Sequence, residues 1–407
     1  TLKVNKIRDT SGSADAITLD PSGGAVLAGV TTMTTARVGA GVTISESGIE
    51  ASGIGITCAN INGTQIGGRR NIVINGAMNV AQRSTSETGL GASAGYFTID
   101  RYRTTFSNTA GRLTMAQVAD VHDGFANAMK FTCTTADTSI GANEYFILQQ
   151  KFEGQDLQQL KKGSSDAEEF TVSFYVKGNA SATYVVEMYD LDNARQVSKT
   201  FSVTTSWTRV VLTFPADTTG ALDDDNAGSL QLGIWLHGGS DYTSGTLSTT
   251  WSSVTQANRA EGITSFFDST DRTFFLTGLQ LEVGSQATPF EHRSFGEELA
   301  LCQRYYYRLA GDDTTIATGH QNGSYGIFPI QFPQDMRAQP TGTAQNVTDA
   351  YSYYYEGGVA RVDSVNLASH NNRHGNLEST SYSTTNGTVG LFRITNSSAY
   401  IDISAEL

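Results

Sequence analysis

Branched aliphatic residues recur at regular intervals near the amino end of the chain. They follow spacings of two, five and five positions, taken twice, at Val42, Ile44, Ile49, Ile54, Ile56, Ile61 and Ile66. Each unit is too short and too rich in glycine to bury an apolar face alone, so neighbouring units or other copies of the chain must cover that face. The pattern predicts an elongated, assembled β stalk over residues 1–70. Disorder is the alternative for such a Thr- and Gly-rich segment, but the regular spacing argues against it.

Strict alternation of apolar and polar residues begins beyond the stalk. It is clearest over residues 170–177, 209–214 and 229–237. A period of two places one face of each strand in a core. About ten such runs, separated by turns rich in Gly, Asp and Ser, predict an antiparallel jelly-roll sandwich over residues 71–293. Residues 155–162 are expected to form a short helical insertion in it.

A helical pattern follows the sandwich. Ser294 and Glu297 have the spacing of a capping box, which marks the start of a helix. Apolar residues then recur at helical spacing, at Phe295, Leu299, Cys302 and Tyr306. We expect a connecting helix within residues 294–308, with Leu299 buried and Glu298 exposed. Strand patterns return over residues 309–407, which predicts a smaller, carboxy-terminal distal β domain. The fold class is therefore mainly β.

Composition excludes several classes of partner. The net charge is −13, and Lys and Arg form no cluster beyond two adjacent pairs, Arg69-Arg70 and Lys161-Lys162. The chain therefore lacks the basic patch of a nucleic-acid binder, and we expect it to bind neither nucleic acid nor an anionic membrane. No apolar run reaches the ~18 residues of a membrane span, so membrane insertion is not expected. The three cysteines, Cys58, Cys133 and Cys302, lack metal-ligand spacing and are expected to be small core residues.

Motifs for catalysis, cofactors and metals are missing from the sequence. It contains no GxSxG, no HExxH, no P-loop and no GxGxxG that opens a helix, so we expect no enzyme and no cofactor. The runs Asp223-Asp224-Asp225 and Asp312-Asp313 offer oxygen ligands for structural calcium or acids for glycoside hydrolysis. Solvated turns are the preferred interpretation of both runs. The histidines are scattered, and the pair His370 and His374 lies in a loop-like context, so no metal site is expected.

Several segments resemble tail-fibre and related virion receptor-binding proteins of tailed bacteriophages. They are NIVINGAMNVAQR (71–83), YFTIDRY (96–102), FTVSFYVKG (170–178) and GLQLEVGSQATPFEHRSFGEELALCQRYYYR (278–308). The last is the most specific, and LKVNKIRDTSGSADAITL also resembles the start of phage fibre stalks. A weaker resemblance, at SWTRVVLTF (206–214) and LQLEVG (279–284), relates the sandwich to carbohydrate-binding jelly rolls.

The resemblance implies a homotrimer located in the virion. Its amino-terminal end would join the phage tail or another virion component. Its distal domain would attach to a host surface polysaccharide or outer-membrane receptor without catalysis. Two other functions remain open. One is a capsule-depolymerising tailspike, although the long repetitive β-helical body of such enzymes is missing from the pattern. The other is a structural virion decoration that contacts no host.

Glycan recognition requires aromatic faces to stack on sugar rings and short polar groups to bond hydroxyls. In the terminal domain, the candidate residues are Tyr353, Tyr354, Tyr355 and Tyr325. Tyrosine occupies both faces of this strand, and only one face can belong to the domain's own core; the other can contact a receptor or a neighbouring subunit. The alternative site lies in the jelly roll, at Trp235, Tyr242 and Trp251. There, the competing interpretation is that the loop folds back and buries the tryptophans.

We predict that the full chain is a homotrimer in solution, because a monomer cannot cover the apolar stripe of residues 42–66. Light scattering should give three times the mass of one chain. Deleting residues 1–70 should leave the sandwich folded and weaken assembly. A monomer mass for the full chain at micromolar concentration would contradict this prediction.

Overall fold

The computed structural model describes eight short strands within residues 1–68, by their backbone, and then residues 69–311, 313–323, 325–345, 347–379 and 386–407. These residues form two compact units, residues 1–59 and 60–407. Among the described residues, no helix has the length and apolar character needed to cross a membrane.

The first unit contains two three-stranded antiparallel sheets. Their strands are β1 (Lys6–Arg8), β2 (Asp15–Leu19) and β3 (Ala25–Leu27), then β4 (Thr35–Val38), β5 (Val42–Ser45) and β6 (Gly48–Ala51). Ile44 of β5 pairs with Ile49 of β6, so two members of the aliphatic repeat lie on neighbouring strands. The later repeat members Ile54, Ile56 and Ile66 lie outside the described residues, as does Cys58.

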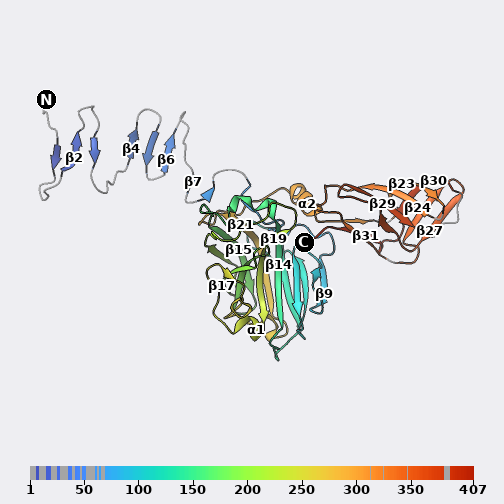
Figure 1. Cartoon of the computed structure of the whole chain (residues 1–407), viewed down its shortest axis with the longest axis horizontal. Helices are drawn as coiled ribbons and strands as arrows, with labels where there is room; N and C mark the ends of the chain where they lie inside the picture. The colour runs from blue at the N-terminus through green and yellow to red at the C-terminus, as the bar shows by residue number, and fades with distance from the viewer. Residues whose placement is uncertain are drawn as a thin grey trace. The chain divides into compact units, whose positions relative to one another are not determined.

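The second unit starts with a hairpin of β7 (Asn60–Ile61) and β8 (Thr64–Gln65) and continues as a β-sandwich (Figure 1). One sheet has the order β10 (Gly95–Tyr96), β11 (Arg103–Ser107), β14 (Tyr145–Glu153), β19 (Gly228–Gly238), β16 (Ala182–Asp190), β17 (Arg195–Val203) and β20 (Ser252–Ser253). The other has the order β18 (Thr208–Phe214), β15 (Phe170–Gly178), β21 (Thr273–Val283), β13 (Ala128–Thr135), β12 (Arg112–Val118) and β9 (Ser86–Leu90). Every pairing is antiparallel, which confirms the predicted mainly β sandwich.

Alternation explains how the sandwich forms its core. In β15, Phe170, Val172 and Phe174 are buried between the sheets, and in β19 Leu232 and Ile234 join the same cluster. Helical elements in the connections are short: η1 (Gly154–Asp156), η2 (Gln158–Leu160), α1 (Ser240–Thr243), η3 (Gln256–Asn258) and η4 (Phe266–Asp268). The expected insertion at 155–162 is thus two turns of 3₁₀ helix and not an α-helix.

The terminal domain has a core of its own, drawn in orange and red in Figure 1. A small sheet has the order β22 (Tyr306–Ala310), β31 (Tyr400–Ser404) and β25 (Thr341–Ala344). A larger sheet has the order β27 (Gly358–Val362), β26 (Tyr351–Tyr355), β30 (Val389–Ile394), β23 (Thr314–Asn322), β24 (Tyr325–Gln331), β29 (His374–Ser379) and β28 (Asn366–Ala368).

Helix α2 (Phe295–Gln303) begins with the predicted capping box, but its buried face differs from the expected one. Phe295 is 58% exposed, whereas Glu298 is buried and its carboxylate accepts the Asn75 N–H at 2.5 Å. Arg293 also donates to Glu298, at 3.3 Å. The expectation of an exposed Glu298 is therefore wrong, because periodicity marks carboxylates as polar and cannot show that other segments supply donors to them.

Buried charge pairs join the terminal domain to the sandwich. The guanidinium of Arg101, 1% exposed, donates to Glu406 at 2.5 Å. Arg304 donates twice to Glu153, at 2.8 and 2.6 Å, and the Tyr305 hydroxyl donates to the same carboxylate. Because these donors and acceptors lie on different elements, the pairs fix how the two domains meet.

Glu406→Ala should lower the free energy of unfolding by about 3 kcal/mol, since it leaves the Arg101 guanidinium buried without its partner. Chemical denaturation measures the loss. Glu356→Ala, at an exposed position, is the control and should change stability by less than about 0.5 kcal/mol. Equal stability of the two variants would show that the pair does not hold the domains together.

Candidate functional site

The seven-stranded sheet of the sandwich, which contains β14, β19 and β16, carries both aromatic and polar side chains on its outer face. Residues that alternate with the core positions point away from the sandwich interior on β14, β19 and β16. They are Tyr145, Ile147 and Gln149, then Gln231, Gly233 and Trp235, then Val185, Glu187 and Tyr189. Gly233 pairs with Gln149 on one side and with Glu187 on the other, so the centre of this row has no side chain. The gap lets the face open into a hollow.

A pocket of about 250 Å³ occupies this face. Its wall is completed by the segment that follows β19, which folds back across the sheet. The lining residues are Tyr145, Ile147, Gln149, Tyr189, Leu191, Gln231, Trp235, Tyr242, Gln256 and Arg259. Aromatic rings and side-chain amides therefore share one concave surface. That combination matches an uncharged, polyhydroxylated ligand.

A buried ion pair forms one wall of the pocket. Arg259 donates to both carboxylate oxygens of Glu187, at 2.7 Å each, and the indole N–H of Trp235 donates to Glu187 at 2.9 Å. Burial would lower the pKa of Arg259, but the Glu187 carboxylate holds that pKa above its ordinary value. The guanidinium also lies 4.9 Å from the centroids of the Tyr189 and Trp235 rings. The charge of Arg259, which lines the pocket, is thus neutralised by the Glu187 carboxylate.

Gln149 and Gln231 lie on the sheet strands that form the floor of the pocket, and their side-chain amides are available to a ligand. Gln149 accepts a hydrogen bond from the Thr105 hydroxyl at 2.7 Å, which orients its amide. For the side chain of Gln231, no hydrogen-bond partner exists among the described residues, although only 5% of this residue is exposed. Opposite the floor, burial raises the pKa of Tyr242, so its hydroxyl stays protonated and can donate. The pocket therefore offers donors and acceptors beside its rings.

The structure separates the three residues of the predicted jelly-roll site. Trp235 is fully buried under the folded-back loop, and Tyr242 lies against it with ring centroids 5.3 Å apart. Trp251 lies outside the pocket: its indole donates to the Pro215 carbonyl at 2.9 Å and its ring packs near Phe170. Stacking of a sugar on Trp235 or Trp251 is therefore not supported, since loop packing covers the first and uses the second. Tyr242 does line the pocket.

The tyrosines of the terminal domain are also partly used by its core. Tyr353 is fully buried, and its ring meets that of Phe328 edge to face, so it cannot present a ring to a ligand as expected. Tyr354, on the other face of β26, is half-buried with the Arg393 guanidinium 5.0 Å from its ring centroid. Tyr355 is half-buried against Tyr353, and Tyr325 is 48% exposed.

Eight of the ten lining residues were not predicted from the sequence, among them Tyr145, Gln149, Tyr189, Gln231 and Arg259. The alternation over residues 229–237 already placed Gln231 on the face opposite the core, so for this residue the signal was present. Only tertiary folding shows that the face is half covered and that Arg259 reaches Glu187.

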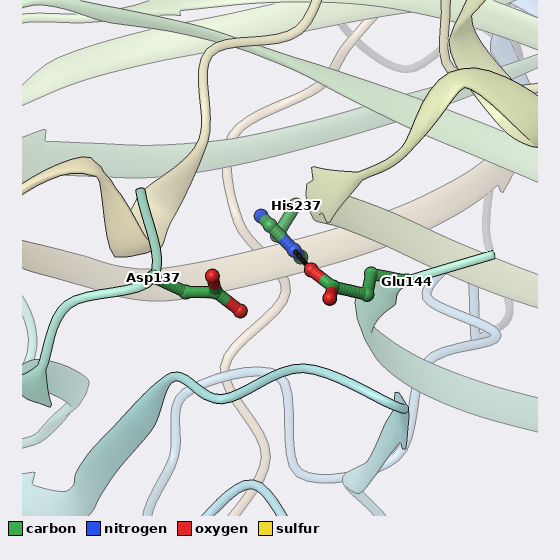
Figure 2. Close-up of side chains that lie close together, drawn as sticks. All are labelled: Asp137, Glu144 and His237. Atoms are coloured by element: carbon green, nitrogen blue, oxygen red, sulfur yellow. Dashed lines mark hydrogen bonds and ion pairs between the residues drawn. The ribbon is translucent and has the colours of Figure 1, made fainter. Parts of the chain in front are cut away.

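A second cluster lies at the end of the same sheet (Figure 2). Asp137, Glu144 and His237 are buried, and one ligand atom from each lies within 4.8 Å of the others. Burial lowers the pKa of His237 to about 4, so its ring is neutral near pH 7. Burial and the adjacent Asp137 raise the pKa of Glu144. This cluster was not predicted from the sequence, because His237 lies about a hundred positions from Asp137 and Glu144.

The acidic runs form no comparable cluster in the part of the chain that the structure describes. Asp223, Asp224 and Asp225 lie in an exposed turn, and the Asp225 carboxylate caps the Ala227 N–H at 2.8 Å. This agrees with the preferred interpretation of a solvated turn. Asp312 lies outside the described residues.

Comparisons with known proteins concern the sandwich. No protein-family model matches the chain, and no curated protein matches it. A structure described as "CBM4 structure and function" has 13% identity, covers 51% of this chain and 97% of its own, and has a TM-score of 0.26. TmCBM61 in complex with β-1,4-galactotriose has 12% identity, coverage of 53% and 99%, and a TM-score of 0.28. The enzymatically active domain of bacteriophage CBA120 tailspike protein 4 has 12% identity, coverage of 52% and 21%, and a TM-score of 0.28. Similarity at this level carries no inference about a ligand or an activity.

Arg259→Leu should destabilise the sandwich by about 3 kcal/mol or more, because it leaves the Glu187 carboxylate buried without a cation. Adding Glu187→Gln should recover part of that loss. Arg361→Leu, which breaks an exposed pair with Asp349, is the control and should cost at most about 1 kcal/mol. Thermal and urea unfolding compare the variants; a harmless Arg259→Leu would mean that the pair is not a structural wall.

Proposed function

We propose that the chain is a receptor-binding protein of a phage virion that attaches, without catalysis, to a glycan of the bacterial surface. The pocket on the outer sheet face is the binding site. One observation carries this proposal: three tyrosine rings and three glutamine amides line one neutral hollow. The resemblance of residues 71–308 to tail-fibre proteins supports the assignment to a virion.

The chemistry of the pocket fits a sugar. The C–H face of a pyranose ring can pack on Tyr189 or Tyr145, and its hydroxyls can exchange hydrogen bonds with Gln149 and Gln231. A buried amide that bonds a ligand hydroxyl discriminates against ligands that lack this hydroxyl, because the amide is then unpaired. With Glu187 paired to Arg259, no net charge selects for an ionic ligand.

The pocket is a better candidate than the tyrosines of the terminal domain. Tyr353 is used in the core, Tyr354 is half-buried beside Arg393, and Tyr325 is 48% exposed. Tyr325 and Tyr354 remain candidates for a second receptor contact. In a homotrimer assembled through the stalk, three weak pockets act together, and avidity can raise apparent affinity by about 10² to 10⁴.

A glycan array followed by titration of the best ligand tests the site. Tyr189→Ala and Gln231→Leu should each weaken binding about 10-fold or more, since each removes one direct contact while Gln231→Leu keeps the side-chain volume. Tyr325→Ala is the control at the competing surface and should bind normally. The opposite ranking would move the receptor site to the terminal domain.

Whole-cell adsorption tests the function itself. The assembled chain should adsorb to host cells, and Gln231→Leu should reduce adsorption more strongly than it weakens a single site, because the loss is multiplied across the trimer. Release of reducing sugar from purified capsule should stay at background. Sugar release would instead support a depolymerase, and failure to adsorb to any host would support a decoration protein.

Salt provides an independent test of the neutral pocket. Because its charges are paired, affinity for the glycan should change less than about threefold between low salt and about 0.5 M, where exposed charges are screened within a few ångströms. A steep fall in affinity with salt would show that charge, and not stacking and neutral hydrogen bonds, carries the binding.

A further inference from the structure

Three side chains with metal-binding groups converge from separate parts of the sandwich. Asp137 lies in the loop after β13, Glu144 directly precedes β14, and His237 is near the end of β19. Figure 2 shows the two carboxylates and the imidazole turned toward one another. The separation of 3.4 Å between His237 Nε2 and Glu144 Oε2 is long for a charge-assisted hydrogen bond.

Neighbouring groups hold the atoms that face away from the cluster. His237 Nδ1 lies 2.8 Å from the Ser265 hydroxyl, so Nε2 is the nitrogen that faces the carboxylates. Asp137 Oδ2 accepts the Thr109 hydroxyl and the Ala110 N–H, both at 2.8 Å, which leaves the second oxygen of the carboxylate for another ligand. Outer hydrogen bonds of this kind orient the ligands of metal sites and fix the histidine tautomer.

The charge of the cluster is not balanced by protein cations. Among the described residues, no Lys or Arg forms an ion pair with Asp137 or Glu144. Elsewhere in the sandwich, buried Glu187 and Glu153 each pair with an arginine. A carboxylate removed from water needs a cation, a proton or a metal ion. Two buried carboxylates beside the Nε2 atom of His237, with no Lys or Arg paired to them among the described residues, therefore leave room for a divalent ion.

We propose that Asp137, Glu144 and His237 bind one divalent transition-metal ion of the Zn²⁺ class. Bonds of about 2.0–2.1 Å around tetrahedral zinc place neighbouring ligand atoms roughly 3.3 Å apart, close to the observed separation of Nε2 and Oε2. One nitrogen and two oxygen ligands suit zinc or a similar transition metal, whereas calcium and magnesium prefer oxygen ligands alone. Water completes the coordination.

The ion has a structural consequence. It ties the loop between β13 and β14 to the end of β19, where the backbone also joins through the Gly239 N–H and the Glu144 carbonyl at 2.8 Å. A ligand that binds only the folded chain raises the stability of that fold by mass action. Metal should therefore protect the sandwich against unfolding, whether or not the chain binds a glycan.

Isothermal titration of the chelator-treated full chain with Zn²⁺ tests the site. The expected result is one tight equivalent per chain together with a raised midpoint of thermal unfolding. Asp137→Asn and His237→Gln should each lower the affinity by at least about 100-fold, and Ser265→Ala, which acts through His237, by about 10-fold to 100-fold. Co²⁺ should give a visible absorption band that is lost in His237→Gln.

His374→Ala is the matched control, because His374 is an exposed histidine of the terminal domain. It should leave the tight equivalent and the thermal shift intact. Should Zn²⁺ binding disappear in His374→Ala, or persist unchanged in a folded Asp137→Asn variant, the proposed site is wrong. Stabilisation by Ca²⁺ alone would also overturn the assignment to a transition metal.

Discussion

Buried carboxylates, and the need of each for a partner, shape much of this protein. Glu187 is neutralised by Arg259 on the outer sheet face, and Glu406 by Arg101 where the terminal domain meets the sandwich. Asp190, the last residue of β16, is paired with Lys162. A pair of this kind adds less to stability than its Coulomb energy suggests, because both ions lose hydration. Its larger effect is on specificity, since the fold must bring both members to one place.

The same constraint links the pocket to the cluster at the sheet end. The folded-back segment after β19 supplies Arg259 to the Glu187 carboxylate, and this contact holds the wall of the hollow. Among the described residues, no arginine forms an ion pair with Asp137 or Glu144. The paired Glu187 thus lies beside the neutral pocket, whereas the unpaired Asp137 and Glu144 form the proposed site for a metal ion. In both places a buried carboxylate requires a compensating positive charge, and the neighbouring side chains decide whether an arginine supplies it.

Periodicity in the sequence was sufficient to predict the β-sandwich. It was insufficient to predict the pocket and the cluster of Asp137, Glu144 and His237. The alternation over residues 170–177 reports burial directly, because the side-chain period of a strand is fixed at two. The capping box at Ser294 reports a local hydrogen bond. Glu298 and Tyr353 were misjudged, because their burial depends on what distant segments bring to them. Asp137 and His237, separated by a hundred positions, could be brought together only by the register of several strands.

The segment with the most specific resemblance to tail fibres contains much of the connection between the domains. Cys302 and Tyr305 are buried there, and Arg304 and Tyr305 both bond Glu153 of the sandwich. Such a segment is constrained by two partners at once.

The terminal domain enters through β22 and leaves through β31, and these two strands pair with each other from Tyr306 to Ala310. The first and last strands of the domain therefore lie side by side next to the sandwich, and Arg337 of the intervening chain adds hydrogen bonds to Asn226 of the sandwich. Chimeras that keep both strands, the bond from Arg308 to Asp402 and the contacts of Arg337 with Asn226 should accept replacement of the remaining chain without disturbing the pocket on the sandwich.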